Sequence, residues 1–352
     1  MNIFKICGKN KGKYRKAGSG LHQNEEKFAA RTDLAIEARE LAREKSREEK
    51  EPDGVEVENL EEEDYVLTRV RIRNEAGSRI MGKPVGSYIT LESQSLKEND
   101  IFSHEAITKA LARELRELAG LEEGDTVLIA GLGNWNITPD ALGPKVVSKV
   151  LVTRHLGESL PEEILRTVRP VAAVSPGVMG ITGIETGEII KGIVEKMRPK
   201  LLIAVDALAA RKTGRINAAI QLSDTGLAPG AGVGNKRKLL SKETLGIPVI
   251  AIGVPTVVDA ATLVNDTMDR MLEEMSRHTE KNTPFYEMLR SMEGEEKYEL
   301  ITELLDPYAE NMFVTPKEVD AVIDRLSGVI ANAVNLALHP GITMEDLQQF
   351  LA

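Results

Sequence analysis

The chain has 352 residues, of which 42% are hydrophobic and 28% are charged, a composition typical of a globular protein with one large domain or two smaller ones. The formal net charge of −10 argues against a surface that binds nucleic-acid phosphates, and no run of about 18 apolar residues indicates a membrane span. The single cysteine, Cys7, excludes an internal disulfide and a thiolate metal cluster, as expected for an intracellular protein.

The N-terminal part of the chain begins without hydrophobic periodicity. Residues 1–33 are polar and glycine-rich, and they start with a basic stretch that lacks the apolar core of a secretion signal, so we predict a propeptide with a flexible arm. A helical pattern covers Leu34–Glu49. The eight acids of Glu51–Asp64 indicate a solvated linker or an insertion. Alternating apolar positions then predict a strand over Tyr65–Arg73, and an amphipathic pattern predicts a helix over His104–Leu118.

The central part of the chain alternates short apolar runs with helical patterns. The runs are Thr126–Ala130, Val171–Val174, Leu201–Val205, Ile216–Leu222 and Val249–Gly253. The helical patterns are Pro139–His155, Glu185–Met197 and Val257–Met275. Because continuous apolar strands between helices form sheets covered on both faces, we expect residues 34–352 to form an α/β domain with a mostly parallel central sheet flanked by helices. Its C-terminal part, from about residue 284 to 352, has only helical patterns.

Asp140 is the first candidate catalytic residue. It follows a predicted strand, and Thr138 fits a helix N-cap while Pro139 fits the first helical position. An acid in the first turn of a helix at the carboxyl end of a strand lies where open α/β sheets place their sites. The alternative is that Asp140 only complements the helix dipole.

Asp206 is the second candidate. It follows the apolar run Leu201–Val205 and precedes further apolar residues, so its carboxyl group loses water unless a polar partner receives it. A helix N-cap is the alternative role. Two acids at strand ends of one α/β sheet can converge at its carboxyl edge, which favours a shared site with Asp140.

Two other motifs leave their roles open. Asp224 stands in an Asp-Thr-Gly sequence, the signature of the all-β aspartic proteases, but the chain has one copy in an α/β pattern, so Asp224 is a reserve candidate. Glycines of Pro229–Gly234 precede three cations that either bind an oxyanion or only face solvent: Lys236, Arg237 and Lys238. The five histidines are not spaced as ligand pairs, and neither a P-loop nor a Gly-x-Ser-x-Gly motif occurs.

The stretch Thr32–Glu37 reads Thr, acid, apolar, Ala, any residue, Glu. This order resembles the cleavage sites of the small acid-soluble spore proteins, which are cut after the first acid. Four longer stretches extend the likeness, and with them the chain resembles the germination proteases, aspartate-dependent endopeptidases of spores: Val127–Pro144, Val174–Gly187, Val205–Lys238 and Gly246–Asp259. The leader is longer and more basic than the family pattern, and residues 51–64 look like an insertion.

The resemblance implies a homotetrameric zymogen of the spore core, a cytoplasmic compartment, that cuts itself between Asp33 and Leu34. Its substrates would be the small acid-soluble spore proteins, with no cofactor, no metal and no direct contact with nucleic acid or membrane. The family's two catalytic aspartates fall on Asp140 and Asp206. We add the hypothesis that Lys236, Arg237 and Lys238 read the acid that precedes the cut.

Amide hydrolysis by two carboxyl groups needs one ionised, to accept a proton from water, and one protonated, to polarise the carbonyl. Asp140 in a first turn suits the anion, and Asp206 after an apolar strand suits the neutral acid. The sheet core also resembles the hydrogenase-maturation endopeptidases, which bind a divalent metal at matching acids with an added histidine that has no evident counterpart here. A metal-dependent maturation endopeptidase and a non-catalytic binding protein therefore stay open as alternatives.

Overall fold

In the computed structural model, the described residues are 32–46, 50–157, 161, 167–229, 238–278, 283, 301, 305 and 312–350. All of them belong to one unit of the chain, residues 31–352. Thr32 and Asp33 are the part of the predicted propeptide that is described. Of the three cations of the predicted basic group, Lys236 and Arg237 lie outside the described residues.

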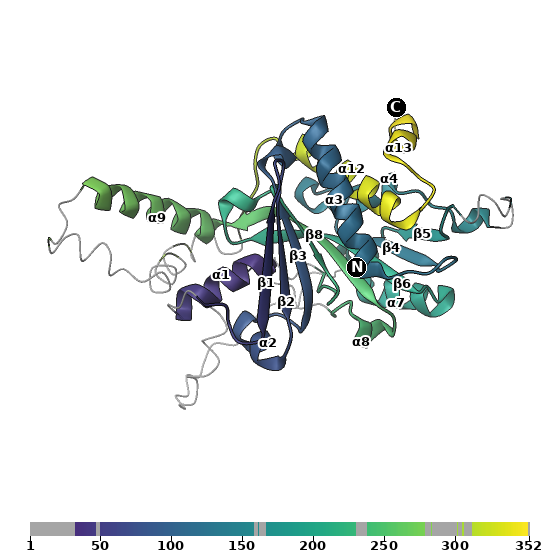
Figure 1. The fold of residues 1–352 in the computed structure, drawn as a ribbon, viewed down its shortest axis with the longest axis horizontal. Helices are drawn as coiled ribbons and strands as arrows, with labels where there is room; N and C mark the ends of the chain where they lie inside the picture. The colour runs from purple at the N-terminus through teal and green to yellow at the C-terminus, as the bar shows by residue number, and fades with distance from the viewer. Residues whose placement is uncertain are drawn as a thin grey trace, which may run out of the picture. The chain divides into compact units, whose positions relative to one another are not determined.

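One sheet of nine strands organises the described residues (Figure 1). Its order is β1-β2-β3-β7-β8-β6-β4-β5, and β9 also pairs with β8. The strands are β1 (Val55–Glu61), β2 (Val66–Ile72), β3 (Gly86–Glu92), β4 (Val127–Gly131), β5 (Val171–Val174), β6 (Leu201–Ala210), β7 (Ala219–Ser223), β8 (Val249–Asp259) and β9 (Phe313–Val314). The predicted α/β class and its parallel core are confirmed, because β8, β6, β4 and β5 run parallel. The neighbours β1, β2, β3 and β7 form an antiparallel half that joins this core through β8.

Helices cover both faces of the sheet. The helices are α1 (Ala35–Ser46), α2 (Glu75–Met81), α3 (Ile101–Ala119), α4 (Leu142–Lys149), α6 (Met179–Thr182), α7 (Thr186–Met197), α8 (Lys242–Leu245), α9 (Ala260–His278), α12 (Val319–Leu338) and α13 (Met344–Phe350). Short 3-10 turns are η1 (Gln94–Lys97), η2 (Thr138–Asp140), η3 (Arg154–Leu156) and η4 (Thr213–Arg215). Because side chains alternate along each strand, the apolar residues separate into clusters on the two faces.

The largest cluster fills the face under α3, α4 and α12, with Ile129, Ile203 and Ile252 from the sheet. The opposite face carries two smaller clusters. One packs α7 and α8 on β4, β6 and β8, and the other packs α1 and α2 on β1, β2 and β3. The first of these clusters includes Leu128 and Leu202, and the second includes Val70 and Tyr88. Polar residues occupy the part of this face between the two clusters.

Residues 51–64 contain a strand rather than the solvated linker that their charge predicted. β1 pairs with β2 from Val55↔Ile72 to Glu61↔Val66. The acids are stabilised by arginines of the next strand and its end, since Glu58 pairs with Arg69 at 3.2 Å and Glu56 with Arg73 at 2.7 Å. Val55 is buried meanwhile, so the strand has one apolar and one charged face.

The predicted helix over Pro139–His155 is divided into η2, α4 and η3, whereas the helices predicted over Leu34–Glu49, His104–Leu118, Glu185–Met197 and Val257–Met275 correspond to α1, α3, α7 and α9. The C-terminal part is helical in α12 and α13 but also contributes β9. Within the described ranges, α12 is the one helix long and apolar enough to cross a membrane, and 72% of that apolar window is buried in the fold.

Candidate active site

Asp206 lies inside strand β6 instead of after it. The strand continues to Ala210 because β8 keeps pairing with it as far as Ala210↔Val258. β4, its other neighbour, pairs with β6 up to Gly131↔Val205, one residue before Asp206. Asp206 is 3% exposed, and its Oδ1 accepts a hydrogen bond from the Ala207 N–H at 3.0 Å. The Asp206 carboxyl group therefore lies at the point where β6 no longer pairs with β4, so that one edge of β6 is open to other segments of the chain.

A row of polar residues crosses the sheet and ends at Asp206. Thr68 pairs with Thr90, Thr90 with Gln221, Gln221 with Gly253 and Gly253 with Asp206. Side chains of directly paired residues share one face, so Gln221 and Asp206 project from the same face on either side of a glycine. All four side chains of the row are buried. This face is the one that carries α1, α2, α7 and α8.

Asp140 reaches the same edge from β4. The loop after β4 stays against β6, since the Leu132 N–H donates to the Val205 carbonyl at 2.8 Å. The Asp140 carboxylate folds back onto this loop and accepts the Asn134 N–H at 2.9 Å. Gly133 has a φ of 110°, and a Cβ there would overlap the Asp140 carbonyl oxygen, so glycine allows this close return. Asp140 therefore follows the end of β4, and Asp206 lies in the neighbouring parallel strand β6, one residue beyond its last pair with β4.

The local structure around Asp140 differs from the predicted helix start. Ile137, not Thr138, is the N-cap of η2, and the Thr138 hydroxyl donates to Asp320 of α12 at 2.7 Å. Asp140 ends this short turn, and α4 begins at Leu142. The carboxylate is thus oriented by a loop amide and not by the first turn of a long helix.

The stretch Thr32–Glu37 lies along the edge of β6, three residues beyond Asp206. Asp33 is bound to Ala209 twice: its N–H donates to the Ala209 carbonyl at 3.4 Å, and its Oδ2 accepts the Ala209 N–H at 3.0 Å. Leu34 is fully buried. The bond predicted to be cut is therefore held beside the strand that carries Asp206.

The carbonyl oxygen of Asp33 receives two side-chain donors. The Lys83 ammonium lies 3.0 Å from it and also 3.0 Å from the Thr32 carbonyl oxygen. The Gln221 Nε2 lies 3.3 Å from the Asp33 carbonyl oxygen, and its Oε1 accepts the Ala35 N–H at 2.7 Å. Lys83 lies in the segment between α2 and β3, and Gln221 lies in β7, so a loop residue and a strand residue supply the donors.

The last residue of the stretch, Glu37, is fixed even more firmly. Its buried carboxylate accepts the N–H groups of Arg211 at 2.7 Å and Lys212 at 3.0 Å. Arg215 approaches it to 3.5 Å, and the Thr32 hydroxyl donates to it as well. Both ends of the stretch are thus held by the segment that follows Asp206.

Burial alters the two charged groups nearest the bond. It raises the pKa of the Asp33 carboxyl, against the attraction of Lys83 and the Ala209 hydrogen bond. It also lowers the pKa of the Lys83 ammonium, against the attraction of Asp33 and Glu37. The charged groups around the Asp33–Leu34 bond are therefore partly removed from water, and this strengthens the electrostatic interactions between them.

Comparison with known proteins decides the family. The sequence model of the germination proteases matches residues 35–290 and 273–351. The germination protease of Caldanaerobacter subterraneus is 51% identical over 91% of this chain and 98% of its own length, and that of Clostridium tetani is 48% identical over 92% and 100%. The chain belongs to the germination protease family. It is accordingly a protease, as the sequence resemblance predicted.

Other relatives extend this family assignment. The germination protease of Bacillus thuringiensis is 47% identical over 91% of this chain and 96% of its own. Among solved structures, the NiFe hydrogenase maturation protease HycI of Thermococcus kodakarensis covers 56% of this chain and 98% of its own, with 19% identity and a TM-score of 0.27. That likeness is too slight to add to the fold described above.

Two other sequence candidates have separate contacts. Lys238 is exposed and pairs with Glu185 at the start of α7, through its N–H at 2.8 Å and its ammonium at 3.9 Å. Asp224 follows β7, which runs antiparallel to β8, and its exposed carboxylate accepts the Ser87 N–H at 2.7 Å. The role of the basic group in this germination protease stays a prediction.

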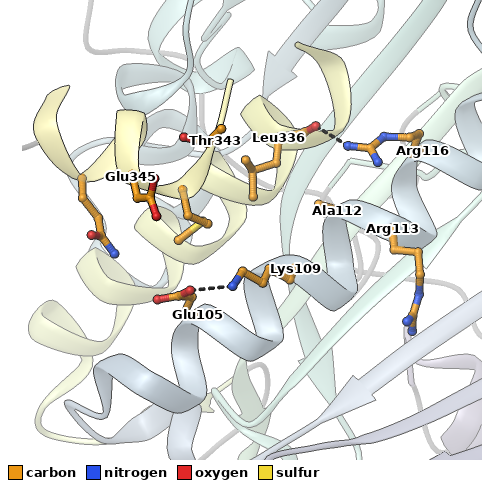
Figure 2. A pocket seen from close by; sticks show the side chains of 10 residues that line it. Glu105, Lys109, Ala112, Arg113, Arg116, Leu336, Thr343 and Glu345 are labelled. Atoms are coloured by element: carbon orange, nitrogen blue, oxygen red, sulfur yellow. Dashed lines mark hydrogen bonds and ion pairs between the residues drawn. The ribbon is translucent and has the colours of Figure 1, made fainter. Parts of the chain in front are cut away.

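No group of three or more His, Cys, Asp or Glu side chains that could hold a metal gathers within the described part of the chain. A pocket between α3 and the α12–α13 segment is lined by Lys109, Arg113 and Glu345, among others (Figure 2). Its helix α3 packs on the face opposite to the Asp206 row, so this pocket is separate from the candidate active site.

Sequence reasoning missed Lys83, Gln221 and Arg215. Gln221 carried a signal, because it is a polar residue inside an otherwise apolar strand, and such residues need a partner when buried. Lys83 and Arg215 carried none, because each meets the Thr32–Glu37 stretch only through contacts between distant parts of the chain.

Proposed function

We propose that this germination protease is an endopeptidase that begins the degradation of small acid-soluble spore proteins, and that it is made as a zymogen that cuts itself between Asp33 and Leu34. One observation carries the proposal: Thr32–Glu37, which matches the substrate pattern, is bound to β6 at Ala209, three residues beyond Asp206. Once Asp33 has left, the acid of a free protein with the same pattern would meet the donors that Asp33 had occupied, the Ala209 N–H and Lys83.

Asp140 and Asp206 are the proposed catalytic pair. Hydrolysis by two carboxyl groups needs no covalent intermediate, since one takes a proton from water and the other supplies a proton. We assign the base to Asp140, whose carboxylate accepts a loop amide, and the acid to Asp206, which is buried in the sheet.

The zymogen would be inactive because its own chain occupies the site. Asp33 covers the edge of β6, and Glu37 uses the amides of Arg211 and Lys212. Removal of residues 1–33 would free the part of the site that precedes the cut. Homotetramer formation and action in the spore core are further proposals from the family resemblance, and sedimentation should then give four times the chain mass of 38.5 kDa.

The test is to incubate matured protein with a purified small acid-soluble spore protein and to map the fragments by mass. We expect one cut after the acid of each Thr-acid-apolar-Ala-x-Glu sequence, and the same cut in the presence of a strong chelator. Absence of cleavage would favour the binding-protein alternative. Cleavage abolished by chelation and restored by a divalent metal would favour the metal-dependent one.

A further inference from the structure

We infer that Lys83 and Gln221 bind and polarise the carbonyl oxygen of Asp33 during the maturation cut, which makes them catalytic residues of that reaction. The inference deepens the proposed function and rests on it. Neither residue belongs to the aspartate pair: Lys83 lies in the segment before β3, and Gln221 lies in β7.

Two donors converge on one oxygen. Lys83 Nζ lies at 3.0 Å and Gln221 Nε2 at 3.3 Å from the Asp33 carbonyl oxygen. The amide of Gln221 cannot rotate freely, because its Oε1 accepts the Ala35 N–H at 2.7 Å. Donors fixed in this way before reaction stabilise an oxyanion without the cost of reorganisation.

Gln221 also relates the carbonyl oxygen of Asp33 to Asp206. Gln221 and Asp206 flank Gly253 in one row, so their Cα atoms lie about 10 Å apart, two strand spacings, with both side chains on one face. The Ala209 N–H of β6 donates a hydrogen bond to the Asp33 carboxylate. Asp33 is thus bound by Gln221 of β7 through its carbonyl oxygen and by Ala209 of β6 through its N–H and its carboxylate.

In the proposed step, water adds to the carbonyl carbon of Asp33 and gives a proton to the ionised carboxylate of the Asp140–Asp206 pair. The carbonyl π electrons move onto the oxygen, where Lys83 and Gln221 donate their hydrogen bonds. The bond from this carbon to the Leu34 nitrogen then breaks, and the protonated carboxyl of the pair gives its proton to that nitrogen. The products are the new C-terminal carboxyl of Asp33 and the new amine of Leu34.

The alternative role is structural: Lys83 and Gln221 would only hold the start of α1 against the sheet. Both roles use the same hydrogen bonds, so stability alone does not separate them. They differ in the rate of bond cleavage at equal stability, and in the effect of the charge on Lys83.

Two variants test the donors in the full-length protein. Gln221→Glu keeps an oxygen that can accept the Ala35 N–H but loses the N–H directed at Asp33. Lys83→Met keeps the length of the side chain and loses the ammonium. Lys109→Met is the matched control, since Lys109 is an exposed lysine on α3 that pairs with Glu105 (Figure 2).

The readout is the first appearance of a chain that starts at Leu34, followed by mass spectrometry. Losing one oxyanion donor typically lowers the rate by about 10²–10³-fold, so we expect this loss for Gln221→Glu and Lys83→Met at near wild-type Tm. Lys109→Met should mature at the wild-type rate. Folded variants of Gln221 and Lys83 that mature as fast as the wild type would overturn the inference.

Lys83→Arg supplies a second test that does not depend on Lys83→Met folding. The charged groups that face Lys83 are Asp33 and Glu37, and burial lowers its pKa despite them. A required ammonium makes the maturation rate fall as pH rises through that pKa. Arginine stays charged, so in Lys83→Arg the fall should move to higher pH. If the maturation rate of Lys83→Arg falls at the same pH as that of the wild type, Lys83 is not a catalytic residue.

Maturation of the wild type and of the variants distinguishes failure of the zymogen proposal from failure of this inference. A wild-type chain that never cuts between Asp33 and Leu34 would refute the proposed zymogen and with it this inference. A wild-type chain that cuts there, while the Lys83 and Gln221 variants cut equally well, would refute the inference and leave the zymogen intact.

Discussion

Asp140 and Asp206 reach one edge of the sheet in different surroundings: a loop amide binds Asp140, whereas β6 and β8 enclose Asp206. We expect Asp140→Asn and Asp206→Asn each to lower the rate of proteolysis by about 10²–10⁴-fold, because each removes a general acid or base. The measurement is turnover of a spore-protein peptide by variants that start at Leu34, with Tm as the check of folding.

Asp224→Asn is the control for these two variants. Asp224 is exposed and lies beyond β7, away from the carboxyl ends of β4 and β6. We expect it to keep its activity. Complete loss in Asp224→Asn, with Asp140→Asn still active, would move the site to the Asp-Thr-Gly sequence.

Asp33 lies in a site that holds its carboxylate by the Ala209 N–H and attracts it to Lys83. Asp33→Lys would bring a second cation beside Lys83 and remove the acceptor of that N–H, so we expect maturation to stop. N-terminal sequencing of the stored protein provides the measurement. A chain produced with Leu34 as its first residue lacks position 33 and should be active without the cut, which separates a block of maturation from a loss of activity. Unimpaired cutting of the Asp33→Lys zymogen would exclude substrate mimicry.

Sequence alone could identify those site residues whose own type and whose neighbours in the chain are both informative. Asp140 and Asp206 follow apolar runs, and Thr32–Glu37 has a pattern of its own. Lys83 has neither, since the residues that it contacts lie about fifty positions earlier in the chain. Its role depends on how β3 and β7 align, and no local rule contains that alignment.

Among the elements, α12 is joined to the segment before β5 through a buried histidine. His339 ends α12 and its Nδ1 accepts the Arg169 N–H at 3.1 Å. Burial lowers the pKa of this histidine from 6.5 to about 4, and the charge of Arg169 acts in the same direction. The folded protein therefore keeps His339 neutral at pH values where the unfolded chain has taken up a proton.

Stability should thus fall as pH drops from about 6.5 to about 4, because over this range the unfolded state binds more protons. The loss from His339 approaches about 3 kcal/mol at the acid end. His339→Asn keeps an acceptor for Arg169 and does not titrate in this range. Urea unfolding at several pH values should show a shallower decline for this variant, and parallel curves would contradict the assignment.

The sequence correctly predicted strands that are marked by a run of apolar residues. It failed to predict β1, whose many acidic residues suggested a solvated linker. The parallel strands β4, β6 and β8 are nearly all buried, so their apolar runs identify them. β1 alternates acids with valine, and its acids are stabilised by arginines at the far side of a hairpin. Composition alone suggested a linker there, because those arginines belong to another segment.

For the whole molecule, the sequence predicted the α/β class and the parallel core but not the antiparallel half. β3 and β7 are separated by more than a hundred residues, and their pairing brings Lys83 and Gln221 to the candidate site. Strands β6 and β8 are also longer than predicted, because they continue past Val205 and Gly253 to Ala210 and Asp259. Their continuation past Asp206 supplies Ala209 and, just beyond Ala210, the amides of Arg211 and Lys212 that bind the Thr32–Glu37 stretch.

The junction of Thr32–Glu37 with α1 has a kinetic consequence. Ala35, Ala38 and Ala42 of α1 are buried against the sheet, so the bond to be cut is delivered by an element already packed in the same chain. A ligand tethered by a short connection has an effective concentration of about millimolar or more. Maturation should therefore be first order, with a half-time that does not change when the zymogen is diluted about a hundredfold, and added peptide substrate at micromolar concentration should not slow it. A half-time that lengthens in proportion to the dilution would mean that one molecule cuts another.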